Sequence, residues 1–219
     1  MLSAADLLNN HEVQTYITKG NEYLGEIGFT EHGFRHVKLV SDVAFGILEK
    51  LGYPARTVEL AAIAGLLHDI GNVINRNDHS VSGALMAFGL LERQEMPMDE
   101  IATVIAAIGN HDEQSGRVVS EVSAALILAD KSDVHRGRVR NQDFATFDIH
   151  DRVNFAVEQS DLQVYPPQNM IVMDLRIDTA ICPVMEYFEI FLTRMVMCRR
   201  AAGLLDCRFA LVINGARLL

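Results

Sequence analysis

An almost wholly apolar segment ends in two ionisable residues, and this feature most constrains what the 219-residue chain can fold into. Residues 60–67 read LAAIAGLL, and His68 and Asp69 follow directly. A segment that is apolar on all sides is predicted to be a buried helix. Because an unpaired charge in such surroundings is costly, the pair needs a partner, and a metal ion is the obvious candidate.

Other potential ligands lie at apolar positions of other predicted helices, namely His36, His79, His111 and Asp130. Imidazole and carboxylate ligands together suit divalent transition metals, so the expected cofactor is one or two ions of Fe, Mn, Co, Ni or Zn. Asp69 has a second oxygen for another ion. A bridging carboxylate typically serves ions about 3.5–4 Å apart, a spacing used for hydrolysis of phosphate esters.

The charge balance limits the partners. The chain has 19 Lys and Arg against 29 Asp and Glu, a net charge of −10. Nucleic acids and anionic membranes recruit clustered positive charge, so neither an extended nucleic acid nor a membrane is expected as a partner. A small phosphorylated ligand held by a few local cations remains compatible. Without a recognisable targeting segment or metal-type cysteine spacing, a cytoplasmic location is expected.

Helical periodicity dominates the first two thirds of the chain. It predicts helices over about residues 4–24, 31–51, 57–70, 78–94, 99–112 and 118–135. Alternating polarity then predicts strands at residues 152–157, 170–177 and 207–213, with a further helix at about 183–202. The expected fold is therefore mainly α. A helical bundle over residues 1–145 carries a small C-terminal antiparallel β-sheet and a helix over residues 146–219, packed on the same body.

The helix predicted from Pro183 carries an apolar stripe. Core packing is the main interpretation of the stripe, and a homodimer face is the alternative. Its members are Met185, Tyr187, Phe188, Phe191, Leu192, Met195 and Val196.

The order of the potential ligands resembles the H…HD…D signature of the HD superfamily of metal-dependent phosphohydrolases. Residues 68–71 match the HDIG form of the core motif, and Val40 stands four residues after His36 as in the first-histidine helix of the family. Residues 79–84, HSVSGA, look like the HxxxGA segment of two-metal members. Residues 110–112 fit a later histidine position, and residues 129–131 match the usual ADK ending. The resemblance covers roughly residues 30–135.

This resemblance implies an HD-domain helical bundle and a role for each ligand. The first ion would be held by His36, His68, Asp69 and Asp130, and the second by His79 and His111 with Asp69 as the bridge. The ions would activate a water and neutralise the developing phosphoryl charge. Asp69 and Lys131 are then the expected catalytic residues, with Lys131 near the substrate phosphate.

Two ligand assignments have a neighbouring competitor. His32 lies one turn before His36, and the spacing to Val40 favours His36 as the ligand. His32 is then expected to bind substrate or to support a ligand. Asp133 lies one turn after Asp130, which is favoured because the preceding residues 126–129 are apolar.

Other residues have a purely structural alternative. His79 stands at the start of a predicted helix beside Asp78, and His111 near the end of another, where a cation favours the helix dipole. The basic run of Lys131, Arg136, Arg138 and Arg140, with His135 inside it, is either a solvated helix end or a phosphate-binding rim. In the second case Lys131 and Arg136 are the first candidates for substrate binding.

We therefore expect a metal-dependent phosphohydrolase, acting on a phosphate monoester or phosphodiester through metal-activated water. The substrate is small, and nucleotides are among the candidates. HD-GYP phosphodiesterases carry a lysine after HDIG and a GYP element, whereas this chain has Asn72 and no GYP in residues 113–117. Two alternatives remain open. One is a di-iron oxygenase similar to myo-inositol oxygenase, and the other is a non-catalytic sensor that binds a nucleotide or a metal.

Overall fold

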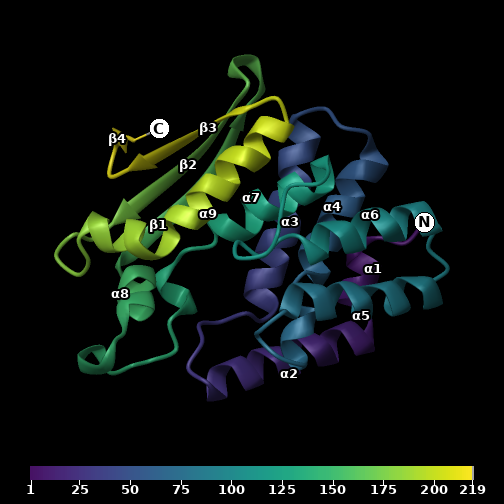
Figure 1. The fold of residues 1–219 in the computed structure, drawn as a ribbon, viewed down its shortest axis with the longest axis horizontal. Helices are drawn as coiled ribbons and strands as arrows, with labels where there is room; N and C mark the ends of the chain where they lie inside the picture. The colour runs from purple at the N-terminus through teal and green to yellow at the C-terminus, as the bar shows by residue number, and fades with distance from the viewer. Residues whose placement is uncertain (219) are drawn as a thin grey trace.

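The computed structural model describes residues 1–218 (Figure 1). Its α-helices are α1 (Ala4–Leu8), α2 (His11–Glu26), α3 (Phe34–Lys50), α4 (Ala55–Leu67), α5 (His79–Arg93), α6 (Met98–Gly109), α7 (Glu121–Ser132), α8 (Ile149–Ala156) and α9 (Val184–Leu204). The strands are β1 (Val157–Tyr165), β2 (Met170–Ile177), β3 (Arg208–Ile213) and β4 (Ala216–Arg217). Within residues 1–218, no helix has both the length and the apolarity needed to cross a bilayer.

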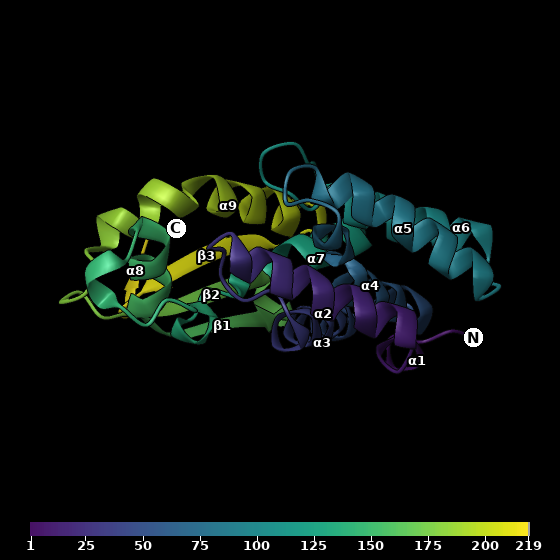
Figure 2. The ribbon, with the colours of Figure 1, turned by 90° about the horizontal axis from the view of Figure 1, so that it is seen from below.

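Helix α4 forms the middle of the helical body. It packs against α1, α3, α6 and α7, and every residue from Leu60 to Leu67 is buried. Helix α7 is buried in the same way from Val122 to Ala129. On the outside, α5 and α6 pack side by side, and α2 lies along the body (Figure 2). The buried central helix predicted from the apolar segment is therefore confirmed.

The single helix predicted over residues 4–24 is wrong, because the structure divides it into α1 and α2. Asn10 causes the division. Its side chain accepts hydrogen bonds from the backbone N–H groups of Glu12 and Val13. These donors have no partner inside a new helix, so a capping side chain stabilises a fresh start there.

The strand predicted at residues 152–157 is also wrong. Those residues form most of α8, and β1 begins at Val157. Asp148 caps the helix, because its side chain accepts from the backbone N–H of Asp151. Val153 is buried and lies four residues after Ile149, so the apolar positions fit a helix as well as a strand.

The C-terminal sheet has the strand order β1-β2-β3-β4 within residues 1–218. The pairs β1–β2 and β3–β4 are antiparallel, but β2 and β3 are parallel. Parallel neighbours need a crossover connection, and α9 supplies it between them (Figure 1). The antiparallel sheet expected from the sequence is thus corrected to a mixed sheet. The mainly helical fold with a small C-terminal sheet and a helix is confirmed.

Helix α9 joins the sheet to the helical body by packing on α7. Tyr187, Phe191 and Met195 are buried, as the core-packing interpretation of its apolar stripe predicts. Met185 and Leu192 on the same helix are 69% and 55% exposed. A homodimer at this face stays a prediction, as does the division of the chain near residue 145.

Gly65 sets the close approach of α4 to α3, so its substitution tests their packing. A Cβ at residue 65 would lie 2.8 Å from Ser41 Cα and 2.9 Å from Ser41 N, and these backbone atoms cannot rotate away. We expect Gly65→Ala to lower the free energy of unfolding in urea by about 1–3 kcal/mol, as overpacked cores do. Gly46→Ala is the matched control. Nothing lies within 4 Å of a Cβ there, so its stability should rise by up to about 1 kcal/mol. Equal stability of the two variants would contradict this packing.

Candidate metal centre

The six predicted ligands converge inside the helical body. They are His36 in the first turn of α3, His68 and Asp69 directly after α4, His79 at the start of α5, His111 just after α6, and Asp130 in the last turn of α7. All are buried except Asp130, whose side chain is 13% exposed. Five helices thus each deliver one or two ligands to one point.

The first set of ligand atoms surrounds Oδ2 of Asp69. The Nε2 atoms of His36 and His68 lie 3.6 and 3.4 Å from it. The same nitrogens lie 3.4 and 3.7 Å from Oδ1 of Asp130. Ligand atoms of His36, His68 and Asp130 all fall within 4.8 Å of one another, as in a cation site.

The second set uses the other oxygen of Asp69. Nε2 of His79 lies 3.5 Å from Oδ1 of Asp69 and 3.1 Å from Nε2 of His111. Ligand atoms of His68, Asp69 and His111 also lie within 4.8 Å of one another. Asp69 therefore stands between two groups of imidazoles, with one oxygen toward each, as a bridging carboxylate does.

Backbone carbonyls fix the tautomer of three of the histidines. A carbonyl only accepts a hydrogen bond, so each Nδ1 is the donor and each Nε2 directs a lone pair at the cluster. The bonds run from His68 to Gly65 at 2.7 Å, from His79 to Arg76 at 3.0 Å, and from His111 to Ile108 at 2.7 Å.

These contacts fit a divalent cation. The Nε2 atoms of His79 and His111 approach to 3.1 Å, although neither has a proton to share in this tautomer. In addition, the buried Oδ2 of Asp69 has no hydrogen-bond partner within residues 1–218. An unsatisfied buried carboxylate oxygen and facing lone pairs are unfavourable alone. A cation that accepts both nitrogen and oxygen ligands satisfies them together.

The protonation states also suit ligation. Burial acts to raise the pKa values of Asp69 and Asp130, but both stay well below the usual range. Neighbouring imidazoles, His68 first, lower the pKa of Asp69, and the Lys131 ammonium together with His36 and His68 lowers that of Asp130. Burial lowers the pKa values of His79 and His111. Burial also acts to lower the pKa of His68, but the Asp69 and Asp130 carboxylates outweigh it and raise that pKa, so metal binding there would displace a proton. Anionic carboxylates and neutral imidazoles are the forms that bind metal.

His36 is oriented by a carboxylate. Its Nδ1 lies 2.7 Å from Oδ2 of Asp133, which also accepts from the Arg35 guanidinium at 2.8 Å. Burial acts to raise the pKa of Asp133, but the His36 hydrogen bond and the Arg138 charge hold it far below its usual range. A carboxylate behind a histidine fixes its ring and raises its basicity as a ligand. Asp133 thus supports the cluster, and Asp130 faces into it.

Gly71 of the HDIG sequence lets α5 reach Asp69. A Cβ at Gly71 would lie 2.1 Å from the backbone oxygen of His79 and 2.5 Å from the nitrogen of Gly83. Backbone this close leaves room only for glycine. The first turn of α5 therefore packs directly on Gly71, and this contact places His79 beside Asp69.

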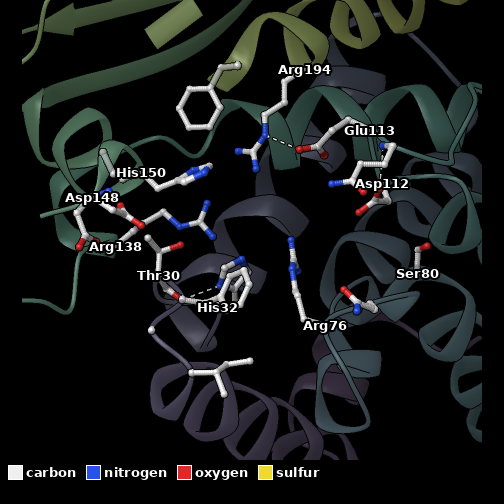
Figure 3. Close-up of a pocket in the computed structure, with 18 of the residues that line it drawn as sticks. Thr30, His32, Arg76, Ser80, Asp112, Glu113, Arg138, Asp148, His150 and Arg194 are labelled. Carbon is white, nitrogen blue, oxygen red and sulfur yellow. Dashed lines mark hydrogen bonds and ion pairs between the residues drawn. The ribbon is translucent and has the colours of Figure 1, made fainter. Parts of the chain in front are cut away.

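A cavity of about 800 Å³ adjoins the cluster. It reaches the cluster through Arg76, whose Nη1 lies 3.8 Å from Oδ1 of Asp69, and through His32, whose ring centroid lies 5.5 Å from that of His36. The guanidinium groups of Arg76, Arg138 and Arg194 point into it (Figure 3). All three guanidinium nitrogens of Arg138 donate to the backbone oxygens of Glu31 and Asp133, so within residues 1–218 Arg76 and Arg194 are the arginines that keep terminal nitrogens for a ligand here.

The predicted substrate-binding residues are placed differently. His32 lines the cavity. Lys131 is 4% exposed, and its Nζ lies between Asp130 at 2.7 Å and Glu113 at 2.6 Å. Arg136 lies over the Phe155 ring and does not line this cavity. Substrate contact by Lys131 or Arg136 stays a prediction.

Sequence reasoning did not select Arg76, Arg194 or His150, which also line the cavity. For two of these residues, the sequence contains a feature that could have indicated a functional role. Arg76 is a cation in the short polar segment between Asp69 and His79. Arg194 is a charge inside the apolar stripe of α9, where burial calls for a partner. No feature of the sequence around the exposed His150 indicated such a role.

The family model for the HD domain matches residues 33–135, which contain all six predicted ligands. Residues 33–135 are therefore an HD domain, as the resemblance in the sequence indicated.

Two relatives are similar to this chain. An uncharacterised protein of Methanocaldococcus jannaschii is 27% identical over 158 residues, which is 62% of this chain and 60% of that protein. The chain thus spans about 60% of the length of this curated relative. A crystal structure of a predicted HD superfamily hydrolase from an uncultured Thermotogales bacterium is 26% identical with a TM-score of 0.45. That match covers 57% of this chain and 67% of the other.

Asp133→Ala tests the support of His36. We expect metal affinity to fall about 10- to 100-fold, the usual effect of removing the carboxylate behind a ligating histidine. Competition with a chromophoric chelator measures the affinity, and far-UV circular dichroism confirms folding. Asp42→Ala, which removes an exposed carboxylate paired with Lys38 on the same helix, is the control and should change nothing. Unchanged affinity in folded Asp133→Ala would show that Asp133 does not orient His36.

Proposed function

We propose that this protein is a metal-dependent phosphohydrolase that cleaves a phosphate monoester or phosphodiester of a small molecule, with nucleotides among the candidates. The observation that carries the proposal is the position of Asp69 between two groups of imidazoles, at the edge of an arginine-lined cavity. The proposed cofactor is one or two ions of Fe, Mn, Co, Ni or Zn, because nitrogen and oxygen ligands together suit these metals.

Divalent ions, when bound, supply Lewis acidity that lowers the pKa of water and neutralises charge on a phosphoryl group. Arg76 adds donors at the same place. Its Nη1 donates to Oδ1 of Asn72 at 3.2 Å, and its Nη2 has no hydrogen bond within residues 1–218. We assign Arg76 to the phosphoryl oxygens, because a guanidinium fixed beside the reacting centre stabilises the charge that develops in the transition state.

His32 lines the cavity, and its Nε2 atom can accept a hydrogen bond. Its Nδ1 donates to the backbone oxygen of Thr30 at 2.7 Å, so Nε2 keeps its lone pair. Burial lowers the pKa of His32 well below its usual value. We assign this neutral imidazole to a hydrogen bond from the substrate or from a water beside it.

The cavity supports a small substrate. Its volume of about 800 Å³ is within the range of small-molecule sites. The net charge of −10 disfavours a long polyanion. A phosphate group with a compact remainder agrees with both observations.

Lys131 acts through the ligand Asp130 in this proposal. Burial acts to lower the pKa of Lys131, but Asp130 and Glu113 outweigh it and raise the pKa. The permanent ammonium holds the Asp130 carboxylate in its ionised form. Lys131 thereby keeps a ligand competent.

The di-iron oxygenase remains the second candidate, because the same six side chains would hold two irons. The terminal nitrogens of Arg76 and Arg194 suit an anionic substrate but do not distinguish the reactions. Protein purified without air and loaded with iron should consume no oxygen with the phosphorylated substrates if hydrolysis is the function. Tight nucleotide retention without any product would instead revive the non-catalytic sensor.

Asp69→Ala tests the bridge. We expect loss of at least one bound ion per chain, and loss of phosphate release with every metal in a screen of nucleotides and generic phosphate esters. The reason is that both ligand sets lose their shared oxygen donor. Elemental analysis and a phosphate assay measure the two effects, and Asp42→Ala is the control. Wild-type metal content together with normal turnover in Asp69→Ala would overturn the proposal.

A further inference from the structure

We propose that the substrate carries a second anionic group, a carboxylate or a phosphate, which is bound by Arg194 and His150 on the cavity wall formed by the C-terminal segment. The proposal rests on the phosphohydrolase function above and names a chemical class for its substrate. Arg76 at the cluster and Arg194 on α9 enter the cavity from different elements (Figure 3).

Arg194 is held rigidly but keeps donors for a ligand. Its Nε donates to Oε1 of Glu113 at 2.8 Å, and its guanidinium lies 4.5 Å from the centroid of the Phe191 ring. Its two terminal nitrogens make no hydrogen bond within residues 1–218, and the side chain is 21% exposed. A guanidinium fixed along one edge presents the other edge to an anion at little entropic cost.

Arg194 shares its carboxylate partner with a buried lysine. Glu113 is its one carboxylate partner within residues 1–218, and Lys131 contacts the same carboxylate at 2.6 Å. Burial acts to raise the pKa of Glu113, but these two cations lower it far below the usual range. Lys131 is also paired with Asp130 at 2.7 Å, so these four charges balance. An anionic ligand would therefore meet Arg194 through its two terminal nitrogens, which carry no hydrogen bond within residues 1–218.

Most acidic residues of the cavity have local partners, so they do not make it a cation site. Asp148 caps α8 through the N–H of Asp151, and the Asp151 side chain accepts from Asn141 at 3.3 Å. Asp112 accepts from the backbone N–H of Gln114 at 2.8 Å. Each of these carboxylates serves the backbone or a neighbouring side chain, whereas the terminal nitrogens of Arg194 do not.

His150 offers a second donor to the cavity from another helix of the C-terminal segment. It lies in the first turn of α8, is exposed, and points its ring into the cavity (Figure 3). An anion between His150 and Arg194 would receive hydrogen bonds from two helices. An aromatic base stacked here is disfavoured, because Arg194 covers a face of the Phe191 ring.

Paired substrates test this subsite. Glycerol phosphate and 3-phosphoglycerate differ by a carboxylate, and AMP and adenosine 3′,5′-bisphosphate differ by a phosphate. The experiment uses metal-loaded full-length protein. In at least one pair, we expect the member with the additional anionic group to have a kcat/KM about 10-fold higher or more. The pair that responds identifies the group as carboxylate or phosphate.

Arg194→Gln should raise KM for the preferred member about 10- to 100-fold, the usual loss for a charge-assisted hydrogen bond. Its kcat, and the kcat/KM of the simpler member, should stay within about threefold. Calorimetric titration of both members should show the same selective loss of affinity. Arg194→Lys should retain part of the preference. Arg200→Gln, an exposed arginine on the same helix that does not line the cavity, is the matched control and should keep it all.

His150→Ala provides a second variant that does not disturb Glu113, and it should weaken the same preference about 3- to 10-fold. Turnover without preference in either pair, or equal losses for both members in Arg194→Gln and His150→Ala, would overturn the second subsite and leave the phosphohydrolase proposal standing. No phosphate release by the wild type from any compound would overturn the phosphohydrolase proposal and this inference with it.

Discussion

The shared carboxylate of Asp69 is the interaction on which the rest of the structure depends. Its two oxygens face two groups of imidazoles 3.4–3.6 Å away, in a place where no hydrogen-bond partner satisfies Oδ2 within residues 1–218. A buried carboxylate oxygen without a hydrogen bond is unfavourable, so the surrounding structure must hold Asp69 in this position. This explains why α4 is buried on every side from Leu60 to Leu67, since this part of the helix carries His68 and Asp69 into the middle of the body. It also explains Gly71, which permits the backbone contact that brings in His79.

The cluster was predictable from the sequence because each ligand is an ionisable residue at a boundary or on an apolar face of a helix. Such residues are rarely buried without a partner. The cavity was not predictable in the same way. Arg76 and His150 stand in polar surroundings, where a cation needs no explanation, and only the fold shows that they face one space. Lys131 was predicted to bind substrate because it belongs to the ADK motif. Its pairing with Glu113, which follows a different helix, depends on the fold and cannot be predicted from the sequence around Lys131.

The C-terminal segment shows which forces override local pattern. The apolar positions of residues 152–157 fit the periodicity of a helix as well as that of a strand. The Asp148 cap stabilises the helical alternative. Strand direction is a long-range property. The sequence placed a helix between two strands but assigned them an antiparallel pairing, although a crossover helix brings the next strand back parallel. Reading α9 as a crossover, and not as an appended helix, would have given the mixed sheet.

A chain of charges makes this segment part of the site. It runs from Asp130 through Lys131 to Glu113 and then to Arg194 on α9, with contacts of 2.7, 2.6 and 2.8 Å. Lys131 lies between the two carboxylates, so its removal would leave both uncompensated, whereas Arg194 at the end of the chain has one partner and is 21% exposed. The predicted ligand Asp130 and the carboxylate partner of Arg194 are therefore both paired with the same buried lysine. Since Arg194 lies outside residues 33–135, the HD domain supplies the six predicted ligands, and the segment after it supplies a guanidinium to the adjoining cavity.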